Sequence, residues 1–136
     1  MSNKDLNFGK INESKVISYL NKFTLNKYKK SNYSFCYYDF ENSKYICELK
    51  SRRNNYKQYP TTMVSKSKID KSIKNKKIIK FYFLFTDGLY SYKYNQNDEL
   101  EFNRGGRNDR NKLEYNDYCF IPIELLKFIT DTIKSI

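Results

Sequence analysis

The sequence contains no histidine and no tryptophan, and only three cysteines, two prolines and four glycines among its 136 residues. The absence of histidine excludes zinc sites built on imidazole, Ser-His-Asp catalysis and nucleases that use histidine as general base. Cys36, Cys47 and Cys119 are odd in number and lack metal-ligand spacing, so we expect reduced, structural cysteines. Any catalytic site in this chain therefore has to rely on carboxylates, lysine and a metal ion.

The chain also lacks a long hydrophobic run. No apolar stretch approaches the length of a membrane span, and residues 1–10 carry no apolar signal-peptide core. We therefore expect an intracellular protein that is not secreted and has no membrane partner. With 39% hydrophobic and 18% aromatic residues, the chain can bury one core, which predicts a single domain over residues 1–136.

Acidic residues are scarce between Lys50 and Lys80. This segment holds eleven basic residues against the single acid Asp70, and so carries nearly all of the chain's net charge of +11. A basic surface of this kind fits a polyanionic substrate, because lysine and arginine side chains meet phosphates and release counterions. The alternative is a solvated, lysine-rich helix without a ligand, since codon usage in an AT-rich genome also inflates lysine content.

The most informative segment is a predicted β-hairpin over residues 34–49, where aromatic and β-branched runs flank a polar turn. With a two-residue loop at Asn42 and Ser43, Asp39 lies opposite Ile46. Side chains alternate along a strand, so Asp39 then shares one face with Glu48 and Lys50. The opposite face carries only core-type side chains: Cys36, Tyr38, Phe40, Tyr45, Cys47 and Leu49.

Two carboxylates beside a lysine suggest metal-dependent phosphodiester hydrolysis. Asp39 and Glu48 would bind a hard divalent cation, and Lys50 would position or activate a water molecule. A third carboxylate, Glu13, lies on the apolar stripe of a helix predicted over residues 5–23 and needs a partner if it is buried. For the hairpin, the alternative is a solvent-exposed Glu-Lys pair on an ordinary hairpin. For Glu13, the alternative is a position at the solvent-exposed margin of the apolar stripe.

Further elements follow the hairpin. Pro60, Thr61 and Thr62 predict the start of a helix in which Lys66 faces the carboxylates. The remaining predictions are a strand at 78–85 buried on both faces, a hairpin turn at 86–88 into a strand at 89–94, a mobile basic loop at about 95–112, a strand at 115–121 and a terminal helix from Pro122.

Glu13 on a first helix, Asp39 and Glu48-Leu49-Lys50 on a hairpin, a lysine-containing helix and a buried strand together resemble the PD-(D/E)XK nuclease superfamily. Within it, the short basic chain is most similar to Holliday junction resolvases and small viral or phage nucleases. The resemblance covers residues 5 to about 94, and Tyr38 stands where the motif has proline. It implies an α/β, restriction-endonuclease-like three-layer core, with a mixed sheet of about four to five strands flanked by helices.

The resemblance implies an Mg²⁺-dependent endodeoxyribonuclease in which Mn²⁺ can substitute. Its implied catalytic residues are Glu13, Asp39, Glu48 and Lys50. Asp39, Glu48 and the backbone carbonyl of Leu49 would hold the metal, and Glu13 would hold a metal-bound water or a second cation. The residues expected to bind nucleic acid are Arg52, Arg53, Lys57, Gln58, Lys66, Lys68, Arg104, Arg107 and Arg110.

The implied partner is nucleic acid, with DNA expected first, and a homodimer stays open because many relatives act as dimers. A viral member would act in the host cytoplasm or nucleus, in DNA repair or recombination. Two other functions fit the sequence: a non-catalytic nucleic-acid-binding module and a virion structural protein that coats DNA. Branched, linear and single-stranded substrates all stay open, because phosphate contacts carry no sequence information.

Overall fold

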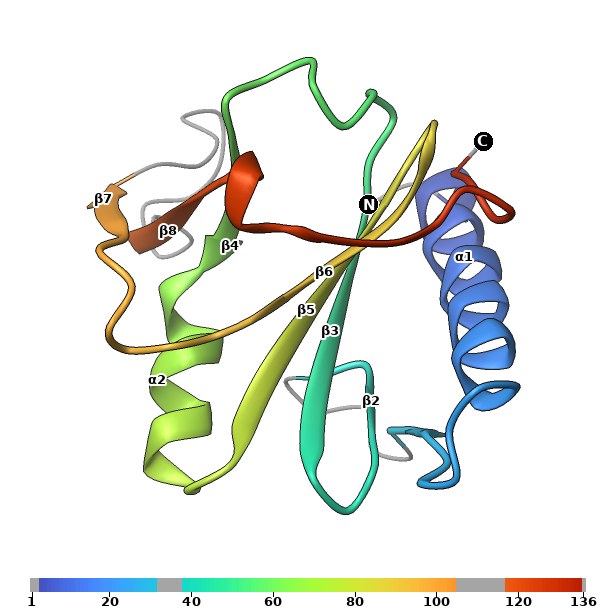
Figure 1. Cartoon of the computed structure of the whole chain (residues 1–136), viewed down its shortest axis with the longest axis horizontal. Helices are drawn as coiled ribbons and strands as arrows, with labels where there is room; N and C mark the ends of the chain where they lie inside the picture. The colour runs from blue at the N-terminus through green and yellow to red at the C-terminus, as the bar shows by residue number, and fades with distance from the viewer. Residues whose placement is uncertain (1–2, 32–37, 105–116, 136) are drawn as a thin grey trace.

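The computed structural model describes residues 3–31, 38–104 and 117–135, with the side chains of residues 3–6 and 104 excepted. A six-stranded mixed sheet, in the order β1-β2-β3-β5-β6-β9, forms its centre, and a three-stranded sheet, β4-β8-β7, lies beside it. Figure 1 shows α1 on one side of the large sheet and α2 on the other. This is the predicted α/β, restriction-endonuclease-like arrangement, with more strands than the four to five expected.

The described elements have the following bounds: α1 Asn3–Asn21, β1 Lys29–Lys30, β2 Phe40–Glu41, β3 Tyr45–Ser51, β4 Thr61–Ser65, α2 Lys66–Lys74, β5 Ile78–Phe85, β6 Gly88–Lys93, β7 Glu101–Arg104, β8 Asp117–Pro122, a 3-10 turn Ile123–Leu125 and β9 Lys127–Thr130. Neither helix of the described segments is long and apolar enough to cross a membrane.

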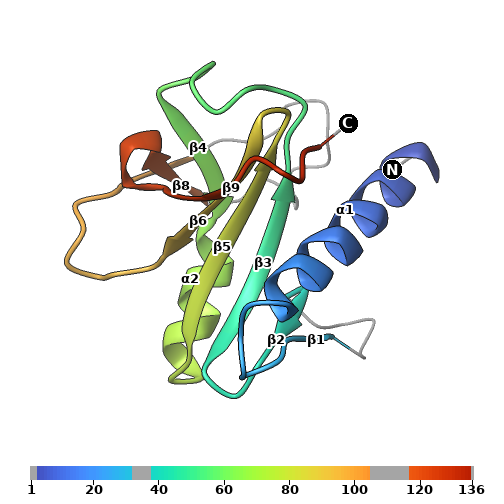
Figure 2. The ribbon, with the colours of Figure 1, turned by 45° about the vertical axis from the view of Figure 1, so that its right-hand side comes forward.

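Helix α1 lies alongside β3, as Figure 2 shows. Its apolar stripe is confirmed for Val16, which is fully buried, and for Ile17 and Leu20, which pack on the same cluster. The prediction that Phe23 belongs to this stripe is wrong, because Phe23 lies beyond the end of the helix and is 73% exposed. The stripe therefore fixes which side of α1 meets the sheet, and places Glu13 at the edge of that side.

The first hairpin has the predicted two-residue loop, but one residue later than expected. Glu41 pairs with Ile46, and the Asn42 N–H donates to the Tyr45 carbonyl oxygen, so the loop is Ser43-Lys44. The cause is the Asn42 side chain, whose Oδ1 accepts the backbone N–H groups of Lys44 (3.0 Å) and Tyr45 (2.8 Å) and so puts Asn42 before the turn. The register is shifted by two residues, which leaves the side chains of the paired residues on their predicted faces.

The two faces of the hairpin differ as predicted. Phe40 and Cys47 are fully buried on the α1 side of the sheet, with Tyr45 and Leu49 packed against them. Ile46 belongs to the other core, on the α2 side. The prediction is wrong for Tyr38, which also packs against the α2-side core, because it precedes β2 and lies outside the strand pairing. Cys47 and Cys119 are buried free thiols, as expected, and Cys36 lies outside the described residues.

The predicted buried strand is β5, with the expected bounds. It runs parallel to β3 and antiparallel to β6. Its residues alternate between the two cores: Phe81, Phe83 and Phe85 face α2, and Tyr82 and Leu84 face α1. The expected turn into β6 is also present, with Phe85 paired to Gly88. β5 therefore holds β3, and the carboxylate on it, in the middle of the sheet.

Gly88 allows this turn to approach the last strand. Its φ is 153°, and a Cβ here would lie 2.8 Å from the backbone oxygen of Thr130 in β9. We expect Gly88→Ala to lower the free energy of unfolding by about 1–3 kcal/mol, because neither backbone can move without breaking the pairing of Leu89 with Thr130. Urea denaturation measures this. Gly9→Ala is the control: Gly9 lies in α1 with no atom within 4 Å of the added Cβ, so that variant should be unchanged or more stable.

The predicted helix start at Pro60 is wrong. Residues 61–65 form β4 instead, with Thr62 and Val64 buried at the two-residue period of a strand, and α2 begins only at Lys66. β4 is a strand because it pairs along its length with β8, more than fifty residues later in the chain. Such a long-range partner overrides the local helix signal of proline followed by threonines.

The predicted terminal helix is also wrong. After the short 3-10 turn, β9 pairs with β6 and completes the edge of the large sheet. Part of the expected loop, Glu101–Arg104, forms β7 against β8, while residues 105–116 lie outside the described segments. The strand expected near residue 115 is β8, over the part that is described.

Candidate active site

The two hairpin carboxylates meet at the middle of β3. The Asp39 N–H donates to the Cys47 carbonyl oxygen (2.8 Å), which brings the end of β2 against β3 next to Glu48. The Asp39 side chain then turns back onto β3, where its Oδ2 accepts the Leu49 N–H at 2.7 Å. One backbone donor thus fixes the orientation of the Asp39 carboxylate beside Glu48.

Glu48 is buried between two lysines. It is only 6% exposed. Lys50 Nζ lies 3.5 Å from its Oε1, and Lys68 Nζ lies 3.8 Å from its Oε2. Within the described residues, Oε2 is buried and has no hydrogen-bond partner. A carboxylate oxygen in this state costs free energy unless a cation or a donor reaches it.

The electrostatics of this pair favour an added cation. Burial and then the charge of Asp39 raise the pKa of Glu48 to about 7, although Lys50 and Lys68 act in the opposite direction. Burial also raises the pKa of Asp39, against the effects of the Leu49 N–H, Lys50 and Lys68. Ionisation of each carboxylate therefore costs free energy in this buried position, and a positive charge between the two would lower that cost for both.

Glu13 stands at the margin of this site. Its Oε1 lies 3.9 Å from Lys30 Nζ, which also donates to Ser14 Oγ at 3.2 Å. Burial and then the charge of Asp39 raise the pKa of Glu13, which puts Asp39 within electrostatic range of both other carboxylates. Nevertheless, the described residues contain no group of three or more acidic or cysteine side chains close enough to bind one metal ion together.

Asp39 and Glu48 fit a hard divalent cation. They offer oxygen donors, which Mg²⁺ and Mn²⁺ prefer, and the buried Oε2 of Glu48, which has no hydrogen bond, is the kind of atom that a cation satisfies. The position of Glu13 fits an indirect role through water. The carbonyl of Leu49 as a further ligand stays a prediction.

The structure brings Lys68, rather than Lys66, to the carboxylates. Lys66 is the first residue of α2, and its Nζ forms an exposed ion pair with Asp70 at 2.9 Å. Lys68 lies two positions further on, where the helix turns toward β3. The sequence predicts only nucleic-acid binding for Lys68, because a helix that starts at Pro60 places Lys66 on the side of the carboxylates.

Two of the arginines expected to bind nucleic acid have contacts within the protein. Arg52 is partly buried, and its Nη2 donates to the Met63 carbonyl oxygen (2.7 Å) and to Thr62 Oγ1 (3.3 Å). The guanidinium of Arg53 lies 4.2 Å from the centre of the Phe8 ring. Their contact with nucleic acid stays a prediction.

The other residues of this set lie apart from the carboxylates or outside the described part. Lys57 and Gln58 are exposed in the segment that joins β3 to β4. Arg104 ends β7, with its side chain undescribed, and Arg107 and Arg110 lie outside the described residues. These five positions therefore stay predictions.

Comparison with known proteins identifies a family for most of the chain. A model of the family described as "phage putative PDDEXK endonuclease" matches residues 2–129, a span that includes both carboxylates and both lysines of the site. No curated protein and no solved structure matches the chain. Nucleases with the PD-(D/E)XK motif generally use divalent metals, which agrees with the carboxylate site. The chain belongs to the phage PD-(D/E)XK endonuclease family.

Proposed function

We propose that this protein is a metal-dependent endonuclease that hydrolyses phosphodiester bonds in DNA. The observation that carries the proposal is the buried carboxylate of Glu48 beside Asp39, which has a lysine on each side and one oxygen, Oε2, without a hydrogen bond. A surface ion pair would leave its carboxylate in water with an ordinary pKa, whereas burial raises the pKa of Glu48 to about 7. Buried carboxylates with perturbed pKa values and specific charged partners are typical of functional sites.

Asp39 and Glu48 would hold Mg²⁺, with Mn²⁺ as a substitute, and Glu13 would contribute through water. When bound, the cation would polarise the scissile phosphate and make water a stronger nucleophile. The Leu49 N–H keeps Asp39 oriented toward Glu48. Lys50 would orient the attacking water or accept its proton, and its charge would offset the negative charge that builds on the phosphate.

The substrate proposal rests on charge and family. The segment from Lys50 to Lys80 follows the carboxylates directly and is strongly basic, as a phosphate backbone requires. The family description names an endonuclease, which favours cleavage over binding alone. A binding module would use the same basic residues but would not need a buried carboxylate with an oxygen that has no hydrogen bond.

One substrate panel tests the proposal. Labelled four-way junction, flap, duplex, single strand, RNA and supercoiled plasmid are incubated with Mg²⁺, Mn²⁺ or EDTA, beside Glu48→Ala. We expect cleavage of at least one DNA with metal, and none with EDTA or in the variant. Glu41→Ala removes a carboxylate from the neighbouring strand and should cut normally. Tight binding with no cut product from any substrate would overturn the proposal and favour a binding module.

Lys68 and Lys66 form a matched pair of variants on α2. Lys68→Ala should slow cleavage by on the order of tenfold, because it removes a positive charge 3.8 Å from Glu48 in a partly buried site. Lys66→Ala should have little effect on the rate, since its ion pair with Asp70 is exposed and weak. Single-turnover cleavage at saturating protein measures both. Equal rates for the two variants would contradict the role given to Lys68.

A further inference from the structure

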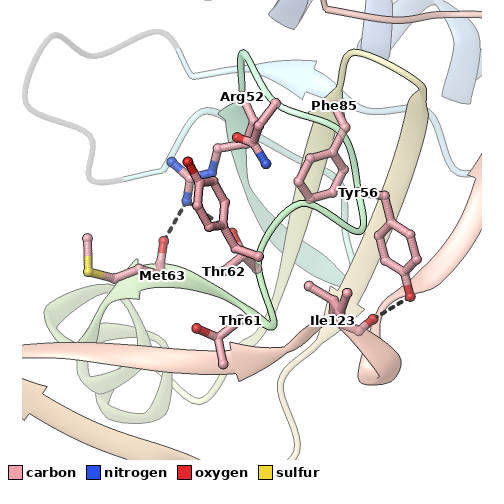
Figure 3. A pocket seen from close by; sticks show the side chains of 9 residues that line it. Arg52, Tyr56, Thr61, Thr62, Met63, Phe85 and Ile123 are labelled. Carbon is pink, nitrogen blue, oxygen red and sulfur yellow. Dashed lines mark hydrogen bonds between the residues drawn. The ribbon is translucent and has the colours of Figure 1, made fainter.

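A cavity of about 220 Å³ lies beyond the carboxyl end of β3, and its lining begins at Arg52, two residues after the proposed catalytic lysine. Figure 3 shows the side chains around it, which come from the segment after β3, from β4, from the end of β5 and from the turn after β8. The residues that line it are Arg52, Asn54, Tyr56, Tyr59, Thr61, Thr62, Met63, Phe85 and Ile123.

Arg52 connects the cavity to the active site. Its backbone N–H donates to the Leu84 carbonyl oxygen (2.9 Å), so the pairing of β3 with β5 continues to this residue. The alternation of side chains therefore also continues, and Arg52 projects from the same face as Glu48 and Lys50. Two residues of extended chain span about 7 Å, which makes the cavity the immediate neighbour of Lys50 along the strand.

The guanidinium of Arg52 is charged but is held by neutral groups. Its Nη2 donates to the Met63 carbonyl oxygen and to Thr62 Oγ1, as Figure 3 shows for Met63. No carboxylate within residues 3–31, 38–104 and 117–135 forms an ion pair with it, and burial lowers its pKa. A guanidinium has five N–H donors, so a ligand with acceptor atoms would find donors here beyond Nη2.

Aromatic rings supply the other walls. Tyr56 is fixed in place: its ring stacks on Tyr90 at 4.0 Å with an interplanar angle of 6°, and its hydroxyl donates to the Ile123 carbonyl oxygen at 2.7 Å. Phe85 meets Tyr56 edge to face. Tyr59, in contrast, is 55% exposed and keeps much of its ring free to contact a ligand. A rigid aromatic wall and an exposed ring are the features that stack on nucleobases.

We propose that this cavity binds an unpaired nucleobase of the nucleic acid being cut, with the base stacked on Tyr59 and its acceptor edge toward Arg52. The inference rests on the proposed function, since it places the base beside the scissile phosphate. The cavity holds the volume of about seven water molecules, which suits one base and not a base pair. The protein should then prefer substrates with an unpaired nucleotide over fully paired duplex.

Binding in EDTA tests the inference without catalysis. Fluorescence anisotropy compares a labelled duplex that has one bulged nucleotide with the same duplex in which the bulge is abasic. We expect wild type to bind the base-bearing bulge at least about fivefold more tightly, the lower range of base-aromatic stacking. Tyr59→Ala should remove this preference and Tyr59→Phe should keep it. Phe23→Ala, which removes an exposed ring at the end of α1, should behave as wild type.

A cavity-filling variant separates the pocket from surface stacking. Thr61→Phe puts a ring into the cavity from β4, and should remove the preference for the base while it keeps the affinity for paired duplex. Equal affinity of wild type for the two bulges would overturn the inference, as would a preference that survives both Tyr59→Ala and Thr61→Phe. Either result leaves Glu48-dependent cleavage standing. Loss of cleavage in the substrate panel with the base preference intact would instead overturn only the proposed function.

Discussion

Lys50→Ala should slow DNA cleavage by on the order of 10³-fold and leave the affinity for DNA within about threefold of wild type. Lys50 Nζ lies 3.5 Å from Glu48 Oε1, where it would face the attacking water and the charge that builds on the phosphate. Its single charge is a small part of a basic segment with eleven such residues, so binding should barely change. Single-turnover cleavage and fluorescence anisotropy separate the two quantities.

Lys44→Ala is the matched control, because Lys44 is an exposed lysine in the loop of the same hairpin and should leave the rate unchanged. Lys50→Arg refines the test. Arginine keeps the charge but cannot give up a proton, so a slow Lys50→Arg points to proton transfer and a fast one to charge stabilisation. Cleavage by Lys50→Ala at the wild-type rate would contradict the role of this lysine.

The faces of the hairpin could be predicted because strand alternation has a period of two. The predicted register paired Asp39 with Ile46, whereas Ile46 pairs with Glu41. The error of two residues moved no side chain of the paired strands to the other face, and Tyr38, which lies before β2, is the exception. Strand β5 was equally predictable, because seven of its eight residues are apolar or aromatic, and such a run fits a centre strand and little else.

Elements that depend on distant partners could not be predicted from local pattern. Residues 61–65 carry a helix-start signal but pair with β8, and residues 127–130 look amphipathic but pair with β6. Because the helix start was predicted at the wrong residue, the position of Lys68 next to Glu48 was also missed, since the helical phase decides which lysine of α2 faces the sheet. The count of basic residues likewise did not predict the contacts of Arg52, whose guanidinium donates hydrogen bonds to Met63 and Thr62 of the same chain.

The metal-free protein should lose stability as pH rises from about 4.5 to about 7. Burial raises the pKa of Glu48 from 4.5 to about 7, so over this range the unfolded chain is ionised while the folded one still holds the proton. Unfolding then releases a proton, and the free energy of unfolding falls by about 3 kcal/mol through this group before it levels off above pH 7. The raised pKa values of Asp39 and Glu13 act in the same direction.

Urea denaturation in EDTA at a series of pH values measures this loss. Glu48→Gln, which cannot ionise, should lose about 3 kcal/mol less than wild type across the window, while Glu41→Gln on the neighbouring strand should follow wild type. Mg²⁺ added at pH 8 should then stabilise wild type and not Glu48→Gln, because only a folded site with both carboxylates binds the ion. Identical pH profiles for wild type and Glu48→Gln would show that Glu48 is ionised without cost, and would remove the electrostatic reason for a cation at this position.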